Sequence, residues 1–446
     1  MKRIALCFDG TWQSVDDPHS VTNVVRVAQA IRAVAQDGVA QILYYQAGVG
    51  SDGGIDRILG GVFGVGLRNN VKRALAFLSL NWTEDGDEIY IFGFSRGAYT
   101  ARAVAGVIGA VGGIPKQEHF DRLTDFWNYY RIDPKVRNAD TPEARAKKKE
   151  MRDLCYPDDA ERDKYPIIKC LGVWDTVGSY GIPAGLGLGG LARRLTSWTK
   201  GFHDHEFGRH VGVGLHALAI DERRRGFPPT AWTIEKGEKL PDENHVEQVW
   251  FTGAHSNVGG SYRCSGLSDL ALIWMMARVE ELTGLEFDVE WVADNFWPCA
   301  ACSLYNSVPG WMLLSKVIPN RRKVLSDQPV RTGGGRQRQY INEKVHWSVI
   351  ERRGKIGVVD ETRYVTYGPK NLPKVIPDER IAHKSVKEAE FIKACLDKGN
   401  PRHKGCVLSR PLDDTKRDRR ARRLARLQAS WRPSSLAANS DSNSLP

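Results

Sequence analysis

The hydrophobic residues of this chain gather in short runs, and four of these runs end at a group of polar residues or glycines. Amphipathic helical patterns fill the gaps between the runs. This alternation predicts an α/β fold, with a mainly parallel sheet flanked by helices on both faces. The expected strands are residues 4–8, 88–92, 167–174 and 246–252. Because ligands of open α/β sheets bind beyond the carboxyl ends of the strands, the residues that follow these runs are the candidates for chemistry.

Helices are expected at residues 22–34 and 67–80, where apolar positions recur with helical spacing. The glycine-rich stretch 60–66 matches neither the dinucleotide motif nor the phosphate-binding loop with its lysine, so we expect a flexible loop there. Residues 140–163 are dense in charge and predict an exposed helical insertion.

The second apolar run leads directly into Gly93-Phe94-Ser95-Arg96-Gly97, a G-x-S-x-G sequence, and a helix-forming stretch follows it. This order of strand, sharp turn and helix is that of a nucleophile elbow. Its glycines lack Cβ atoms, which lets the backbone segments around a strained serine approach each other. The alternative is a glycine-rich turn that carries a solvated serine.

A serine nucleophile needs a histidine that takes its proton and an acid that orients that histidine. Ser95, Asp175 and His255 follow one another in the chain order of α/β-hydrolases, and each lies just beyond an expected strand. Asp221 is the alternative acid, unless it is a charge at a helix end that pairs with a neighbouring arginine. His346 is the alternative base, although a packed histidine explains it as well.

The oxyanion of such a reaction needs two N–H donors. We expect one from the backbone of Arg96 and the other from Gly10 or Thr11 in the loop after the first strand. Asp9 is expected to hold that loop by accepting hydrogen bonds. A competing interpretation is an aspartyl phosphotransferase with Asp9 as nucleophile, but Thr11 stands where such enzymes carry a second aspartate.

Composition is ordinary for a globular protein, with 41% hydrophobic and 26% charged residues among 446. No apolar run reaches the roughly 18 residues of a membrane-spanning helix, and the first run ends before a signal-peptide core is complete. We therefore expect a cytoplasmic protein, with export by a signal-independent secretion system as the alternative. Residues 178–201 mix glycine, apolar and basic side chains, which predicts either a mobile lid that meets lipid or a packed loop.

The net charge of +11 is uneven, because residues 410–432 hold nine Lys and Arg against three Asp. This segment predicts either a basic amphipathic helix that touches an anionic membrane or a solvated helix, and no specific nucleic acid is predicted. The Ser- and Asn-rich end beyond it is expected to be disordered.

Eight cysteines are scattered along the chain, and most are expected to be buried and reduced. Cys299 and Cys302 have C-x-x-C spacing without a second pair, and the histidine-rich stretch 203–210 lacks a closing pattern. We therefore expect no metal and no cofactor.

Several segments match one family in their order along the chain. They are Phe8-Asp9-Gly10-Thr11-Trp12, Thr22-Asn23-Val24, Gly93-Phe94-Ser95-Arg96-Gly97, Gly172-Val173-Trp174-Asp175-Thr176, His216-Ala217-Leu218-Ala219-Ile220-Asp221 and His255-Ser256-Asn257-Val258-Gly259-Gly260. Together they resemble the type VI secretion phospholipase-like α/β-hydrolases, over roughly residues 3–375. The resemblance implies an α/β-hydrolase fold, a Ser/Asp/His esterase centre at Ser95, Asp175 and His255, and a lipid or phospholipid substrate.

Two positions depart from the family's pattern. Asn257 stands where the family usually has aspartate, and Ser261 where it usually has glycine. Both lie in the loop that orients His255, so relative activity is expected to depend on them. The resemblance also brings an immunity or chaperone protein into consideration as a partner.

We expect a catalytic domain at residues 1–285, with insertions near 115–165 and 178–210, then an accessory region at 286–400 and a tail at 401–446. The overall expectation is a serine carboxylester hydrolase. The alternative is a catalytically weak scaffold that binds a partner or a membrane through its basic tail.

Overall fold

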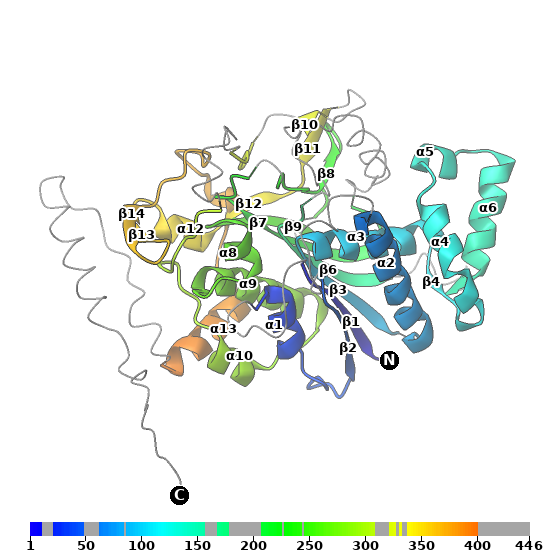
Figure 1. Cartoon of the computed structure of the whole chain (residues 1–446), viewed down its shortest axis with the longest axis horizontal. Coiled ribbons are helices and arrows are strands. Elements are labelled where there is room, and N and C mark those ends of the chain that lie inside the picture. The colour runs from blue at the N-terminus through cyan, green and yellow to red at the C-terminus, as the bar shows by residue number, and fades with distance from the viewer. Residues whose placement is uncertain are drawn as a thin grey trace, which may run out of the picture.

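The computed structural model describes residues 1–10, 21–48, 62–83, 86–156, 167–177, 207–224, 227–242, 245–307, 321–326, 330–331 and 337–399. Its centre is an eight-stranded sheet of order β15-β12-β9-β7-β6-β3-β1-β2, in which all neighbouring strands are parallel (Figure 1). The strands are β1 Arg3–Phe8, β2 Gln41–Gln46, β3 Glu88–Phe94, β6 Ile168–Trp174, β7 Val211–Ala219, β9 Val246–Phe251, β12 Glu343–His346 and β15 Ile381–Ala382.

The α/β architecture expected from the sequence is confirmed, and the four expected strands are β1, β3, β6 and β9. Strand β7, which lies between β6 and β9 at the middle of the sheet, was not among the expected strands. Glycines interrupt its apolar pattern. One of them, Gly214, allows the close approach of Phe207, because a Cβ there would lie 2.2 Å from its ring.

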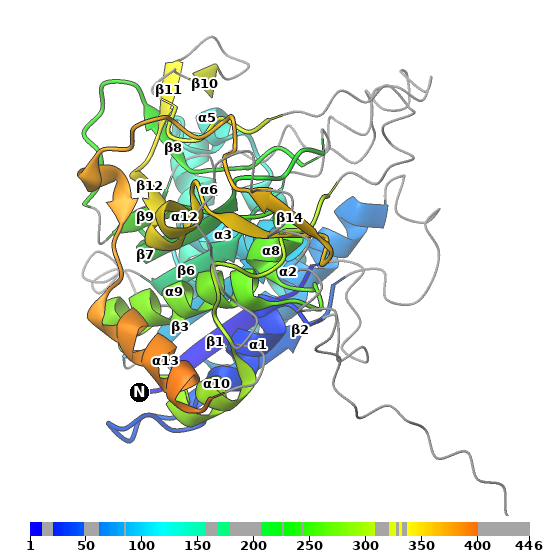
Figure 2. The same cartoon turned by 90° about the vertical axis from the view of Figure 1, so that its left-hand side faces the viewer.

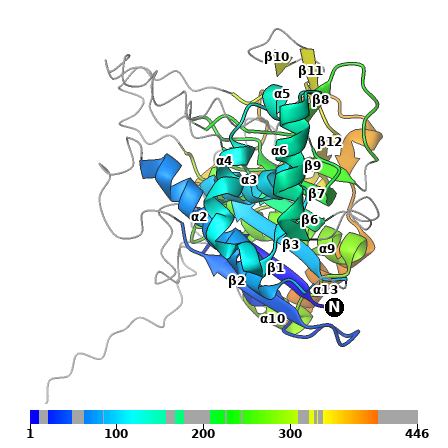
Figure 3. The ribbon, with the colours of Figure 1, turned by 90° about the vertical axis from the view of Figure 1, so that its right-hand side faces the viewer.

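Helices cover both faces of the sheet because side chains of each buried strand point alternately to the two sides. In β1, Ala5 and Cys7 join the core under one helical layer, and Ile4 and Leu6 join the core under the other. Figure 2 shows the first layer, which contains α1 Asn23–Ala30, α9 Gly266–Thr283, α10 Val289–Asn295 and α13 Val386–Asp397. Figure 3 shows the second, which contains α2 Val62–Asn81, α3 Arg96–Val111 and α4 Leu123–Tyr130.

Two local expectations differ from the structure. The helix expected at residues 22–34 ends at Ala30, the last residue of α1. Residues 62–66 belong to α2 instead of a loop. Glycine lowers helix propensity by about 1 kcal/mol per residue, but the later turns of α2 bury Val71, Ala74 and Leu78 against the sheet. Tertiary packing of this apolar face outweighs the local cost.

The charged insertion is helical, as expected, and it extends away from the sheet beside α2 and α3 (Figure 1). It contains a 3₁₀ helix, α4 and two further helices, and a two-stranded ribbon joins its ends. The bounds are Gln117–Arg122 for the 3₁₀ helix, Pro134–Arg137 for α5, Pro142–Asp153 for α6, Ile114–Pro115 for β4 and Cys155–Tyr156 for β5.

The chain beyond residue 285 contributes β12 and β15 to the central sheet itself. The remaining elements are α8 His255–Gly259, α12 Trp347–Arg352, a 3₁₀ helix at Asp378–Arg380, the sheet of β8 Thr233–Glu235, β10 Val330–Arg331 and β11 Gln337–Tyr340, and the hairpin of β13 Ile356–Val359 and β14 Arg363–Thr366. Among the helices that the structure describes, none combines the length and apolar character that crossing a bilayer requires.

Candidate active site

Ser95 occupies the sharp turn between β3 and α3, with a φ of 58° and a ψ of −119°. A serine in this left-handed region is strained, and such strain persists only where the surroundings fix the backbone. Here the Ser95 N–H donates to the carbonyl of Trp174 on the neighbouring strand, at 3.1 Å. The sharp turn from strand to helix is the one expected from the sequence, and the role of Ser95 as a nucleophile stays a prediction.

The two glycines of the motif lie where no side chain fits. A Cβ at Gly97 would lie 2.1 Å from the carbonyl oxygen of Phe8, and one at Gly93 would lie 2.7 Å from the Cα of Ala98. These contacts bring α3 onto the ends of β1 and β3. The tight turn therefore depends on both glycines.

Three side chains meet at the carboxyl ends of β3, β6 and β9. The Nε2 of His255 lies 2.8 Å from the Oγ of Ser95, and its Nδ1 lies 2.5 Å from the Oδ2 of Asp175. All three residues are buried. The rings of Phe94 and Phe227 pack against the imidazole, with centroid distances of 4.6 and 5.1 Å. The three residues singled out in the sequence thus form one continuous hydrogen-bonded chain, the arrangement that activates a serine.

A fourth residue, Arg322, completes the surroundings of Asp175. Its guanidinium donates to both carboxylate oxygens, at 2.5 and 3.0 Å, and the backbone N–H of Ala219 donates to Oδ1 at 3.0 Å. Burial alone would raise the pKa of Asp175. The charge of Arg322 and the hydrogen bonds from His255 and Arg322 outweigh it, so the pKa lies well below its usual range. Asp175 is therefore a carboxylate at neutral pH.

Arg322 was not identified in the sequence. It lies in a run of basic residues at 321–323, a pattern typical of a solvated surface, and no spacing links it to Asp175. Its pairing is visible only in the fold, where it also donates to the carbonyls of Ala219 and Phe227.

The backbone of His255 is held by Glu222, whose Oε2 accepts the His255 N–H at 3.3 Å. Burial tends to raise the pKa of Glu222, but hydrogen bonds from Arg224 and its charge lower it overall. Glu222 also accepts a bond from the hydroxyl of Ser307 at 2.9 Å. The loop before α8 is thus fixed by a buried anion, Glu222, which was not among the candidate residues of the sequence.

Asn257 fixes the same helix from its other side. Its Oδ1 accepts the N–H groups of Ala254 and Tyr305, at 3.2 and 3.1 Å, and its Nδ2 donates to the carbonyl of Ser303 at 3.1 Å. A carboxylate could accept the first two bonds but could not donate the third. The asparagine therefore suits this loop where the family usually carries aspartate.

The alternative acid and base lie outside this hydrogen-bonded chain. Asp221 follows strand β7, not a helix, and its Oδ2 accepts the N–H of Gly253 at 2.8 Å and the hydroxyl of Tyr367 at 2.9 Å. His346 is buried and contacts Glu388 at 3.0 Å and Ser348 at 2.7 Å. Asp221 positions the strand that leads to His255, and His346 is packed in the core.

The expected oxyanion donors lie close to Ser95. Arg96 is the first residue of α3 and directly follows Ser95. A Cβ at Gly10 would lie 3.5 Å from the Cβ of Ser95. In this structure the Gly10 N–H donates to Oδ1 of Asp9 at 2.6 Å. Thr11 lies outside the described residues.

Asp9 holds its loop, as expected. Besides Gly10, its carboxylate accepts the hydroxyls of Thr22 and Tyr45, both at 2.9 Å. Burial raises the pKa of Asp9 to about 6, although these three bonds oppose the shift. Both oxygens of the Asp9 carboxylate therefore accept hydrogen bonds that hold the loop. A nucleophile that attacks phosphate needs an oxygen that the substrate can approach.

Of the histidine-rich stretch, only His210 lies within the described residues, and burial lowers its pKa to about 4. No metal-binding group of His, Cys, Asp and Glu occurs in the part of the chain that the structure describes. The segment 178–201 and the basic tail lie outside it.

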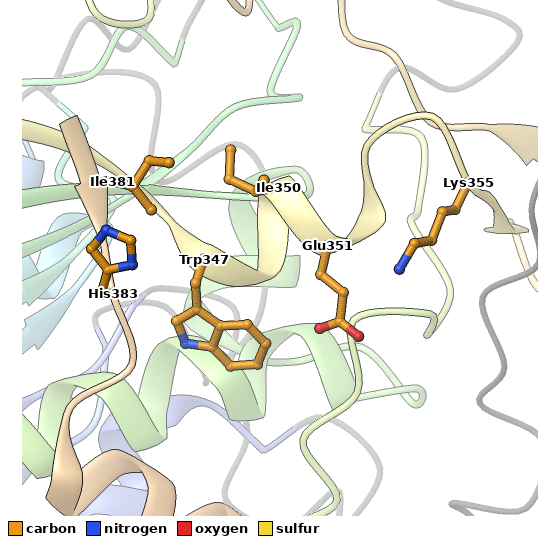
Figure 4. Close-up of a pocket in the computed structure, with 6 residues that line it drawn as sticks. All are labelled: Trp347, Ile350, Glu351, Lys355, Ile381 and His383. Atoms are coloured by element: carbon orange, nitrogen blue, oxygen red, sulfur yellow. The ribbon is translucent and has the colours of Figure 1, made fainter. Parts of the chain in front are cut away.

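A separate cavity of about 240 Å³ lies between α12 and the end of β15 (Figure 4). It is lined by Trp347, Ile350, Glu351, Lys355, Ile381 and His383. Within the described chain, none of these side chains hydrogen-bonds Ser95, Asp175 or His255.

Known proteins resemble parts of this chain. An uncharacterized protein of Saccharomyces cerevisiae is 31% identical over 269 residues, which are 55% of this chain and 35% of that protein. A crystal structure of an uncharacterized protein from Pseudomonas aeruginosa has a TM-score of 0.41 at 19% identity, and covers 65% of this chain and 47% of its own. The structure of the Tle1 effector bound to the VgrG spike from the type 6 secretion system has a TM-score of 0.30 at 19% identity, and covers 59% and 52%. The chain thus spans about a third to a half of these relatives.

A family described as "T6SS, Phospholipase effector Tle1-like, catalytic domain" matches residues 2–278. This range holds the elbow and all three members of the hydrogen-bonded chain. Arg322 lies beyond it. The match covers more than half of the sequence, and the chain therefore belongs to the T6SS phospholipase effector Tle1-like catalytic domain family.

Proposed function

We propose that this protein is a serine carboxylester hydrolase of the phospholipase type. The observation that carries the proposal is the continuous chain of contacts from Asp175 through His255 to Ser95, with Ser95 on a strained elbow. A serine hydroxyl in this setting has a base within proton-transfer distance, and that base has an anion behind it.

In the proposed reaction the Oγ of Ser95 attacks the ester carbonyl while its proton passes to the Nε2 of His255. His255 then gives this proton to the departing alcohol, which leaves an acyl-enzyme on Ser95. Water attacks the acyl group with His255 again as the base. Asp175 keeps the Nδ1 proton directed toward itself and stabilises the imidazolium, and Arg322 keeps Asp175 ionised.

The oxyanion is proposed to bind the N–H of Arg96, with Gly10 or Thr11 as the second donor. If Gly10 serves, its N–H must leave Asp9, to which it donates at 2.6 Å. No cofactor or metal is part of the proposed mechanism.

A phospholipid substrate is proposed from the family's description. Arg96 directly follows Ser95, and burial lowers the pKa of its guanidinium only to about 10, so it is cationic at neutral pH. We propose that this cation interacts with the phosphate of the substrate.

The test compares wild-type protein with Ser95→Ala on short- and long-chain p-nitrophenyl esters and on fluorogenic phospholipid vesicles. Ser79→Ala is the matched control, because Ser79 is a buried serine on α2 whose hydroxyl has no hydrogen-bond partner among the described residues. We expect Ser95→Ala to lose at least about 10³-fold in kcat and Ser79→Ala to keep full rate. Equal rates in wild type and Ser95→Ala, or a folded wild type inactive on every ester, would contradict the proposal.

From family membership we also propose two kinds of protein partner, a type VI secretion apparatus that delivers the protein and an immunity or chaperone protein that neutralises it.

Contact with an anionic membrane is proposed for the basic tail. Deletion of residues 410–446 tests that contact. Binding to anionic liposomes should fall while turnover of a soluble ester stays unchanged. A pure binding scaffold would show no turnover in either form.

A further inference from the structure

Three thiols from two distant parts of the chain form a cluster beside the start of α9. Cys264 lies in the loop between α8 and α9, and Cys299 and Cys302 follow α10. They pack together with Leu267 and Trp297 in one small apolar cluster. The described part of the chain holds no disulfide, so all three are reduced.

Within this thiol cluster, the thiol of Cys302 hydrogen-bonds the sulfur of Cys264. Gly266 makes their approach feasible, because a Cβ there would lie 2.3 Å from the Sγ of Cys302. The two residues also differ in access. Cys264 is half-buried, whereas Cys302 is 6% exposed. Of the two residues, Cys264 is therefore the more accessible from solution.

Backbone donors stabilise negative charge on Cys264. The N–H of Ser303 points at its Sγ, at 3.4 Å, and Gly266 supplies a second backbone bond. The bond from Cys302 and these donors lower the pKa of Cys264, although burial and the neighbouring Cys299 oppose the shift. By contrast, burial raises the pKa of Cys395 to about 12. Since the thiolate is the reactive form, the cluster favours reaction at Cys264.

We propose that Cys264 and Cys302 are a peroxide-reactive pair, with Cys264 as the attacking thiolate and Cys302 as the resolving thiol. The Cys264 sulfur attacks one oxygen of a hydroperoxide, the O–O bond breaks, and the alcohol or water leaves with a proton. Cys264 becomes a sulfenic acid. The Cys302 sulfur then attacks the Cys264 sulfur, the S–O bond breaks, and the departing hydroxide takes the Cys302 proton as water.

The crosslink would join two segments that already hold α8. Asn257 of α8 donates to the carbonyl of Ser303, directly after Cys302, and the Ser303 N–H points at Cys264. Oxidation would therefore tighten the support of the helix that carries His255. A dithiol reductant restores both thiols.

The experiment oxidises the reduced full-length chain with hydrogen peroxide, blocks remaining thiols with iodoacetamide and maps the peptides without reduction. We expect a peptide that links Cys264 to Cys302 and lacks two hydrogens, and that dithiothreitol removes. This readout is independent of ester hydrolysis. A Cys264 that stays open to alkylation, or that is linked to Cys299 instead, overturns the proposal.

Variants separate the two roles. Cys302→Ser and Cys302→Ala should both accumulate sulfenic acid at Cys264, trapped by dimedone, and Cys264→Ser should give neither product. Cys395→Ser is the matched control and should form the linked peptide as wild type does. In the reduced wild type, iodoacetamide should alkylate Cys264 at least about tenfold faster than Cys395. Equal rates at these two sites would count against a selective thiolate.

Discussion

Arg322 and Asp175 form a buried bidentate ion pair, in which Nη1 faces Oδ1 at 2.5 Å and Nη2 faces Oδ2 at 3.0 Å. A planar guanidinium matches a carboxylate in this way, and lysine cannot. The pair lies behind His255, so a residue beyond the family-matched range sets the charge of the candidate catalytic acid.

Replacing Arg322 by Met should leave the Asp175 carboxylate buried without its cation. Breaking such a pair costs about 3–5 kcal/mol, and we expect that loss in urea unfolding at pH 7. The pKa of Asp175 is lowered in the fold, so the pair contributes stability above about pH 4, the ordinary value. That contribution is lost as pH falls through the folded pKa.

Acid unfolding of Arg322→Met should accordingly begin at a higher pH than that of wild type, and Arg322→Lys should lie between them. Arg145→Met removes an exposed arginine that pairs with Asp140, and it serves as the control. A variant at position 322 that unfolds at the same pH as this control would show that the Arg322–Asp175 ion pair does not stabilise the fold.

The contribution of Asp9 to folding stability should have the opposite pH dependence. Burial raises its pKa to about 6, so between roughly pH 4 and 6 the folded chain holds a proton that the unfolded chain releases. Stability from this group is full below about pH 4 and declines as pH rises through about 6. Over that window the loss is about 2–3 kcal/mol.

Asp9→Asn should remove this decline, since an amide does not titrate and can still accept the N–H of Gly10. Urea unfolding of both proteins at pH 4, 5, 6 and 7 checks it. Parallel curves for variant and wild type would mean that Asp9 is ionised throughout.

Ser261 has a φ of 89°, in the region that favours glycine, at the position where the family usually has glycine. Ser261→Gly removes this strain, which costs about 1–2 kcal/mol, but adds freedom to the unfolded chain worth about 0.5–1 kcal/mol. We expect a net gain of about 0.5–1 kcal/mol, measured as a rise in Tm. A lower Tm would show that the serine side chain is needed here.

Gly97→Ala should prevent the close contact of α3 with β1, because its Cβ would lie 2.1 Å from the Phe8 carbonyl oxygen. We expect a destabilisation of about 3 kcal/mol or more and loss of ester hydrolysis. Gly368→Ala is the matched control, since no atom of the described residues lies within 4 Å of a Cβ there. Hydrolysis by Gly97→Ala at the wild-type rate would contradict the packing argument.

The sequence predicted the site residues that directly follow an expected strand. Ser95, Asp175 and His255 each end a continuous apolar run, and parallel strands bring such ends to one edge. The structure places the three in hydrogen-bond contact. Their catalytic roles stay a prediction until the variants are measured.

Other parts could not be predicted because their causes are not local. Arg322 acquires its role from carbonyls and a carboxylate far away in the chain. Glu222 resembles a surface charge until Arg224 and the His255 N–H enclose it. The early start of α2 at Val62 depends on the sheet beneath its later turns, which outweighs its glycines.

The late arrival of β12 has a consequence for synthesis. Until residues 343–346 leave the ribosome, the side of β9 that pairs with β12 has no neighbouring strand. The indole of Trp250 also lacks the Glu343 carboxylate, which accepts its N–H at 2.8 Å in the folded chain. An open apolar strand edge is a template for aggregation. A nascent chain that ends near residue 278 would therefore contain every member of the candidate triad and still need protection from its neighbours on the same polysome.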